Sequence, residues 1–266
     1  MTKVAVIGNG WVGQSMIKIF PDAYVYTRKI GKKEKVNQCD VAFICVPTPS
    51  GHVSPSKGEK LPDLNGRLDT SIVGEIIKWC ECPLIVIRST VNPGDTYKWK
   101  LLYKKHLVVQ PEYLGETPDH PMYNPKTRQF MIIGGAEPDR KKLIDLYGTV
   151  YNANINIRQV SDYVAEVIKL TENRAIAFKV AQIQELYDVC QAAQVDFYEV
   201  RQAVYGDDPR FNLWWTLVFP NKRGFNSKCI PKDVYAWAAW AEGMGIKPEI
   251  TNAILERNER WINGNN

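Results

Sequence analysis

The chain has 266 residues, of which 45% are hydrophobic and 24% charged, and its formal net charge is +5. This composition is typical of a folded globular protein with one large or two small domains, and the absence of a run of about 18 apolar residues argues against a membrane span. The positive charge suits an anionic ligand, but no long basic tract exists, so we expect no nucleic-acid binding.

The cysteines and the first residues of the chain indicate the cellular compartment in which the protein is expected. Residues 1–8 read as a strand running into glycine, whereas a secretory signal needs a longer apolar run and a cleavage site. Six cysteines are scattered along the chain, and no second pair or histidine cluster completes a metal site. We therefore predict a cytoplasmic protein with reduced thiols and no metal.

The first predicted element is an apolar strand that ends in a glycine-rich turn. Residues 4–7 run directly into Gly8-x-Gly10-x-x-Gly13, and an amphipathic segment follows at 14–20. In dinucleotide-binding folds the first glycine permits the tight turn, the second admits a pyrophosphate and the third allows close helix–strand packing. The turn predicts a dinucleotide site, and a glycine turn without a ligand is the alternative.

The second predicted strand, at 23–26, ends at Thr27-Arg28-Lys29. Folds that prefer NAD usually place an acidic residue here to bind the ribose hydroxyls, and this chain has none. Thr27 and Arg28 suit a 2′-phosphate instead, so the predicted cofactor is NAD or NADP. The alternative is that Arg28 and Lys29 are solvated turn residues.

Further apolar strands are predicted at 41–46, 84–87, 107–109 and 130–133, with helices at 70–80 and 96–105 between some of them. Apolar runs without alternation, separated by helices, indicate a parallel sheet that is covered on both faces. Ligands of such sheets bind at the carboxyl ends of the strands. The polar residues there, among them Thr90, Glu112 and Glu116, are candidates for a site, although they could simply bond the strand ends.

A long helix is predicted at 162–193, where the chain has no glycine or proline. It is long enough to link two domains or to pack against its mate in a dimer. Ala165, Lys169, Asn173 and Ala177 recur every four residues on one stripe. Lys169 could bind an oxyanion and Asn173 could orient a substrate or a water, unless the two form an ordinary solvated pair.

A thiol precedes another predicted helix near the C-terminus. Pro231 suits the first position of a helix, which places Cys229 just ahead of the helix start, between Lys228 and Lys232. The helix dipole and the two cations favour a thiolate. With Asp233 in the first turn, the pair could form an acyl-thioester and activate the water that hydrolyses it. The alternative is a half-buried packing cysteine.

Taken together, these motifs resemble the UDP-glucose/GDP-mannose dehydrogenase family. The matching motifs, in chain order, are Gly8-Asn9-Gly10-Trp11-Val12-Gly13, Val46-Pro47-Thr48-Pro49, Ser89-Thr90-Val91-x-Pro93-Gly94, Pro111-Glu112-Tyr113-Leu114-x-Glu116, Glu166-x-x-Lys169-x-x-x-Asn173 and Gly224-Phe225-x-x-x-Cys229-x-x-Lys232-Asp233. The resemblance implies an α/β fold, with a Rossmann-type doubly wound parallel sheet followed by a long helix and a smaller all-helical domain. The expected domains are 1–157 for the dinucleotide and 158–266 for the long connecting helix with the central helical domain.

The resemblance also implies an activity. A nucleotide-sugar such as UDP-glucose would be oxidised twice at its C6 hydroxyl to a carboxylate, with two NAD(P) molecules per turnover and a homodimer formed through the long helix. Cys229 would be the nucleophile that forms a thiohemiacetal and then a thioester, and Lys169 would steady the oxyanion. Asp233, with Thr90 and Glu116, would hold and activate water.

The resemblance gives further residues a role. Glu112 would be an acid/base and Asn173 would line the site. The implied substrate contacts are Tyr113, Leu114, Lys169, Asn173, Arg210 and Phe225. The expected cofactor contacts are Gly8, Gly10, Trp11, Val12, Gly13, Thr27, Arg28, Val46, Pro47, Thr48, Ser89 and Thr90.

Three features depart from the family pattern. Asn226, Ser227 and Lys228 stand where the family typically has Gly-Gly-Ser, and Thr27 replaces the usual acid. The chain ends at Asn266, whereas family members continue into a third, nucleotide-binding domain, so we expect a short form. Two alternatives remain open: a two-electron hydroxyacid dehydrogenase that does not need Cys229, and a dinucleotide-binding remnant without turnover.

Overall fold

The computed structural model describes residues 2–50, 65–113, 115, 123–127, 129–152 and 154–264. These residues fall into two compact units. Unit 1 takes in the described residues up to Pro49 and those from Leu68 to Lys169, and unit 2 takes in Leu170 onward together with Ser50 and residues 65–67.

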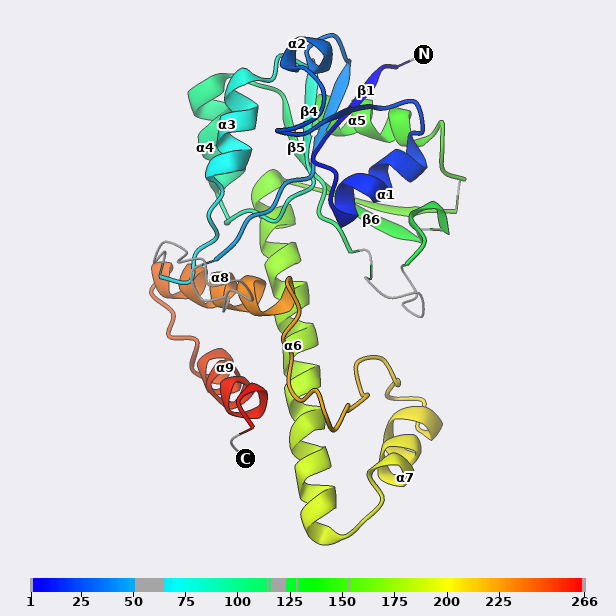
Figure 1. The fold of residues 1–266 in the computed structure, drawn as a ribbon, viewed down its shortest axis with the longest axis vertical. Helices are drawn as coiled ribbons and strands as arrows, with labels where there is room; N and C mark the ends of the chain where they lie inside the picture. The colour runs from blue at the N-terminus through cyan, green and yellow to red at the C-terminus, as the bar shows by residue number, and fades with distance from the viewer. Residues whose placement is uncertain are drawn as a thin grey trace. The chain divides into compact units, whose positions relative to one another are not determined.

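Unit 1 is built around a sheet that has seven strands among its described residues (Figure 1). They lie in the order β2-β1-β3-β4-β5-β6-β7. Their bounds are β1 (Val4–Ile7), β2 (Tyr24–Tyr26), β3 (Val41–Ile44), β4 (Leu84–Ile87), β5 (Leu107–Val109), β6 (Phe130–Gly135) and β7 (Asn156–Val160). The strands from β2 to β5 pair in parallel, and Ile7, Ile44, Ile87 and Val109 share one register. The carboxyl ends of these strands therefore meet at one edge.

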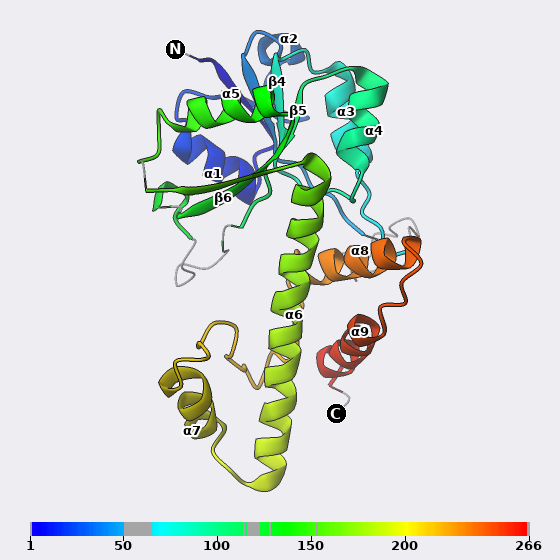
Figure 2. The ribbon, with the colours of Figure 1, turned by 180° about the vertical axis from the view of Figure 1, so that it is seen from behind.

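Helices cover both faces of this sheet (Figure 2). The helices of unit 1 include α1 (Trp11–Ile19), α2 (Lys33–Val36), α3 (Ser71–Trp79), α4 (Asp95–Tyr103) and α5 (Glu137–Tyr147). Along β3, Val41 and Phe43 belong to one apolar cluster, while Ala42 and Ile44 belong to the other. Because both faces are buried, the strands read as continuous apolar runs, as predicted.

Two features of the sheet differ from the sequence-based expectation. β6 runs antiparallel to β5, whereas the sequence predicted a parallel sheet and gave no sign of an antiparallel strand within it. A parallel neighbour needs a crossover helix, and the described residues between these strands hold only a short 3-10 turn, η1 (Pro125–Thr127). The edge strand β7 was not predicted, because its side chains are mostly exposed and polar and it carries no apolar run.

The long helix α6 (Asp162–Ala193) has the predicted bounds. It is followed in unit 2 by α7 (Phe197–Arg201), a π-helical turn η2 (Gln202–Asp207), α8 (Ile230–Gly243) and α9 (Glu249–Ile262). The C-terminal region is helical as predicted, but residues 208–229 hold neither helix nor strand. One apolar cluster of unit 2 packs Ala177 and Ala181 of α6 against Val234 of α8 and Leu255 and Trp261 of α9.

Candidate active site

The glycine turn between β1 and α1 leaves room for a ligand at one position only. Gly8 has φ +107°, and a side chain there would collide with the carbonyl oxygen of Cys45. A side chain at Gly13 would collide with the carbonyl oxygen of Gly8, whereas nothing lies within 4 Å of the space beside Gly10. Gly10 is also the N-cap of α1. The residues therefore fit a dinucleotide, whose pyrophosphate would approach the first N–H groups of α1 over Gly10.

The end of β2 offers an exposed cation. The hydroxyl of Thr27 accepts the N–H groups of Lys29 at 3.2 Å and of Ile30 at 3.0 Å, so it closes its own turn. Arg28 is exposed beyond this turn. Two residues were predicted to meet a 2′-phosphate. Thr27 is uncharged and its hydroxyl is used within the turn, so Arg28 is the one that could offer a cation.

The loops that follow β3 and β4 are joined by Ser89. Its hydroxyl donates to the carbonyl oxygen of Val46 at 2.7 Å and accepts the Val46 N–H at 2.9 Å. Thr48 is buried, Thr90 is half-buried and Pro47 is exposed. Val46 and Ser89 are therefore brought together at the edge of the sheet where the parallel strands end.

A buried ion pair stands at the same edge, between the residues that follow β4 and β5. The guanidinium of Arg88 is fully buried and donates to the carboxylate of Glu112 and to the carbonyl oxygen of Gln110 at 3.0 Å. Glu112 also accepts the N–H of Tyr113 at 2.8 Å. A buried cation is tolerated only when a counter-charge meets it, so the pair fixes the place of the Glu112 carboxylate.

Sequence reasoning predicted Glu112 but missed Arg88. The available signal was a charged residue directly after the apolar strand at 84–87, a position where only a paired charge is buried. Nothing local says which carboxylate pairs with it, because 24 residues separate the two.

Lys169 and Tyr113 also come together within unit 1. The Lys169 ammonium nitrogen lies 5.1 Å from the centroid of the Tyr113 ring, which is within the range of a cation–π contact. Leu114 and Glu116, which follow in the predicted motif, lie outside the described residues.

In unit 2, Cys229 is the N-cap of α8. Its carbonyl oxygen accepts the N–H of Asp233 at 3.2 Å, and the hydroxyl of Ser227 accepts the N–H of Ile230 at 3.1 Å. The residue is exposed, whereas the other five cysteines of the chain are buried. The substituted loop therefore still presents the thiol at the helix start.

The carboxylate of Asp233 is buried and contacts two polar side chains, those of Lys232 and Asn173. Its side chain is 0% exposed. One oxygen pairs with the Lys232 ammonium at 2.6 Å, and the other accepts a hydrogen bond from the Asn173 amide. Lys232 offsets the charge, and Asn173 of α6 is tied to α8. The predicted action of Asp233 on a water stays a prediction, because the carboxylate is closed off from solvent here.

The last two predicted substrate contacts lie in different surroundings. Phe225 is buried in the apolar cluster of unit 2, and its N–H and carbonyl are held by the Asn258 side chain at 2.8 and 3.1 Å. Arg210 is exposed and pairs with Asp208 at 2.6 Å. It lines a hollow of about 680 Å³ together with Lys179.

A doubly wound sheet with a glycine turn and open space at the start of α1 defines a dinucleotide-binding protein of the α/β class. Two family models match the chain: the NAD-binding domain of the UDP-glucose/GDP-mannose dehydrogenase family over residues 24–153, and the central domain of the same family over residues 163–260. The chain belongs to the UDP-glucose/GDP-mannose dehydrogenase family, and NAD(H) is the cofactor of its first domain.

Individual relatives agree with this family. The chain is 25% identical over 228 residues to UDP-glucose 6-dehydrogenase of Rickettsia typhi. This alignment covers 83% of this chain and 49% of that protein. It is 27% identical over 251 residues to GDP-mannose 6-dehydrogenase of Azotobacter vinelandii, covering 86% and 53%. The chain thus spans about half the length of the curated relatives it matches.

Solved structures share the fold. A UDP-glucose dehydrogenase from Pyrobaculum islandicum aligns with a TM-score of 0.78 at 21% identity, over 97% of this chain and 68% of the other. A UDP-D-ManNAc dehydrogenase from Pyrococcus horikoshii aligns with a TM-score of 0.75 at 20% identity, with the same coverage. Within the described part of the chain, no helix combines the length and the apolar character needed to cross a bilayer.

Proposed function

We propose that the chain oxidises the C6 hydroxyl of a nucleotide-sugar, such as UDP-glucose, to a carboxylate with NAD(P) as the oxidant. The observation that carries the proposal is the exposed thiol of Cys229 at the start of α8, with the Asp233 carboxylate one turn later. The family supports the reaction class, and its relatives named as UDP-glucose and GDP-mannose 6-dehydrogenases support the substrate class.

The first oxidation needs a base and a group that steadies charge on oxygen. In the proposed reaction Glu112 takes the proton of the C6 hydroxyl, and Lys169 stabilises the negative charge that develops on that oxygen. Bound nicotinamide supplies the hydride acceptor for each of the two oxidations. The product of this stage is the C6 aldehyde.

The second oxidation passes through the thiol. The Cys229 thiolate forms a carbon–sulfur bond with the aldehyde carbon, and Lys169 stabilises the resulting oxyanion. Loss of the remaining hydride from C6 leaves a thioester. A water held by Asp233, Thr90 and Glu116 attacks the thioester carbon, the carbon–sulfur bond breaks, and the carboxylate leaves with the thiol restored.

The ratio of NADH formed to sugar consumed tests the number of electrons transferred. The proposed reaction forms two NADH for each acid released. A ratio of one supports the two-electron hydroxyacid oxidation, in which Cys229 has no part. NADH binding without any turnover on a panel of nucleotide-sugars supports the dinucleotide-binding remnant.

Replacing the thiol tests the covalent step. Cys229→Ser is expected to lower the rate of acid formation by about 10³-fold or more, because an alcohol is a poor nucleophile without a dedicated base. Its melting temperature and NADH affinity should stay at wild-type values, since the side chain is exposed. Cys190→Ala, which removes a buried thiol of the same unit, is the matched control. Acid formation at the wild-type rate in Cys229→Ser removes the thiol from the mechanism.

A further inference from the structure

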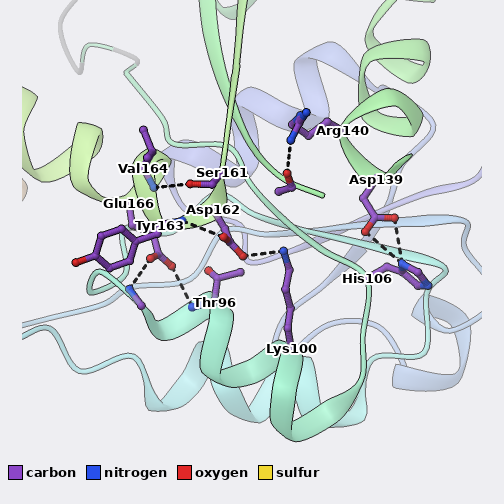
Figure 3. A network of polar contacts seen from close by, with 12 residues as sticks. Thr96, Lys100, His106, Asp139, Arg140, Ser161, Asp162, Tyr163, Val164 and Glu166 are labelled. Atoms are coloured by element: carbon purple, nitrogen blue, oxygen red, sulfur yellow. Dashed lines mark hydrogen bonds and ion pairs between the residues drawn. The ribbon is translucent and has the colours of Figure 1, made fainter. Parts of the chain in front are cut away.

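Side chains at the start of α6 cap this helix and join it to α4 (Figure 3). The Ser161 hydroxyl accepts the N–H of Val164 at 3.3 Å, and Asp162 pairs with Lys100 of α4 at 2.7 Å. The second contact with α4 is made by Glu166, one helical turn further along. It differs from Asp162 because it is 2% exposed and accepts backbone N–H groups of the other helix.

The Glu166 carboxylate caps the start of α4 from another element. It accepts the N–H of Gly94 at 2.6 Å and the N–H of Thr96 at 3.0 Å. Gly94 is the N-cap of α4 and has no side chain to offer these donors. The first N–H groups of a helix have no partner within the helix, so a carboxylate from α6 satisfies what α4 cannot.

These two hydrogen bonds join segments that carry residues of the candidate site. Gly94 ends the loop that begins at Ser89 and contains Thr90, and Ser89 holds the other end of that loop to Val46. Lys169 follows Glu166 by three residues on α6 and lies over the Tyr113 ring. Glu166 therefore sets the distance between the Thr90 loop and the helical turn that carries Lys169.

The charge of Glu166 changes near neutral pH. Burial raises the pKa of its carboxyl group to about 7, against the lowering effect of the Thr96 side chain and of the N–H groups of Gly94 and Thr96, and the nearby Asp95 carboxylate raises the pKa further. Asp95 is itself near the Lys98 ammonium, at 3.8 Å. The other charged groups at this junction are Lys100 of α4, which is engaged by Asp162, and Lys169 on the same helix as Glu166.

Protonation would change the number of hydrogen bonds that Glu166 can accept. An ionised carboxylate accepts through both oxygens, whereas the protonated oxygen of a carboxylic acid becomes a donor that faces another donor. One of the two bonds to Gly94 and Thr96 is then lost.

We propose that Glu166 is a pH-responsive positioning residue for the cofactor site, whose ionised carboxylate holds the Thr90 loop against the Lys169-bearing turn of α6. The inference concerns cofactor binding by unit 1 and does not depend on the proposed oxidation of a sugar. Above neutral pH both hydrogen bonds form and the loop is held. Below neutral pH one bond is released and the cofactor binds less tightly.

Amide hydrogen exchange of Gly94 and Thr96 in the full chain reads this contact directly. After correction for intrinsic exchange, protection of at least one of the two amides should rise about tenfold as pH increases through about 7. In Glu166→Gln the protection should be low and independent of pH. Asp162→Asn, which breaks the neighbouring ion pair but touches neither amide, should keep the wild-type profile.

NADH titration supplies the second measurement. Wild-type affinity should increase about threefold to tenfold between about pH 6 and pH 8, whereas Glu166→Gln should stay at the weaker value throughout. A wild-type exchange profile that is flat near neutrality overturns the proposal even if the variant does not fold, and so does an unchanged pH profile in Glu166→Gln. A chain that shows both effects but oxidises no sugar refutes the proposed function and leaves this inference standing.

Discussion

The guanidinium of Arg88 and the carboxylate of Glu112 illustrate how a single residue depends on its partner. Arg88 has a 0% exposed side chain and follows a strand made only of apolar residues. Placing such a cation in the interior is costly, and the Coulomb attraction of Glu112 offsets that cost only while both are present. Removing one partner leaves the other charged and without water.

This pairing predicts that removing one partner destabilises the protein much more than replacing both partners together. Arg88→Met should lower the free energy of unfolding by about 3–5 kcal/mol, measured by urea denaturation, because the Glu112 carboxylate stays buried without its cation. The double variant Arg88→Met/Glu112→Gln should recover most of that loss. Arg158→Met, at an exposed position of β7, is the control and should change stability by less than about 0.5 kcal/mol. Equal stability of Arg88→Met and the wild type would contradict the assignment.

At the scale of elements, the turn from β1 into α1 contains glycines that serve two different purposes. Gly13 allows the helix to pack against the backbone of Gly8, whereas Gly10 keeps a space open beside the start of α1. The first use concerns folding and the second concerns the ligand. The spacing Gly8-x-Gly10-x-x-Gly13 had assigned these uses from the sequence, with ligand approach at Gly10 and close packing at Gly13.

The two glycines should respond differently to a methyl group. Gly13→Ala is expected to lower the melting temperature, because its Cβ collides with the carbonyl oxygen of Gly8 and the backbone must shift. Gly10→Ala should melt like the wild type but bind NADH about tenfold or more weakly, since its methyl group occupies the approach of the pyrophosphate. Thermal unfolding and NADH titration of both variants make the comparison. Normal NADH affinity in Gly10→Ala would place the cofactor elsewhere.

The junction of α6 and α4 links pH to folding with a definite sign. Because the pKa of Glu166 is raised to about 7 in the folded protein, the folded state holds this proton more tightly than the unfolded chain. The contribution of this group to stability is full below about pH 4.3, the usual glutamate pKa, and is lost as pH rises through 7. Stability and loop positioning by Glu166 therefore favour opposite ends of this pH window.

At the scale of the whole molecule, unit 2 carries a stretch of exposed apolar side chains. They are Phe211, Leu213, Trp214, Trp215, Leu217 and Phe219. Soluble monomers rarely expose so many large apolar groups in one short stretch. We propose that this stretch, together with α6, forms the interface of the homodimer that the family resemblance implies.

Light scattering of the purified chain tests this proposal. The expected mass is twice that of one chain at micromolar concentration, and Leu217→Asp should shift the population to single chains, because a buried unpaired carboxylate opposes association. Met244→Asp places the same charge at another exposed apolar position of unit 2 and should leave the dimer intact. A single-chain mass for the wild type at every concentration would rule the dimer out.

Local pattern in the sequence was sufficient for much of this protein. Continuous apolar runs placed β1 to β6, the absence of glycine and proline set the bounds of α6, and Pro231 marked the start of α8 after Cys229. These signals succeed because strand burial, helix continuity and helix starts depend on neighbours within a few residues. The motifs, read in order, also predicted the family.

Only the tertiary structure decided which distant groups meet. The pairing of Arg88 with Glu112, the hydrogen bond from Asn173 to Asp233, and the capping of α4 by Glu166 join residues that are far apart in the sequence. The direction of β6 and the existence of the polar edge strand β7 were likewise decided by pairing with neighbouring strands. A one-dimensional pattern records which residues prefer burial, but burial alone does not specify a hydrogen-bond partner or a strand direction.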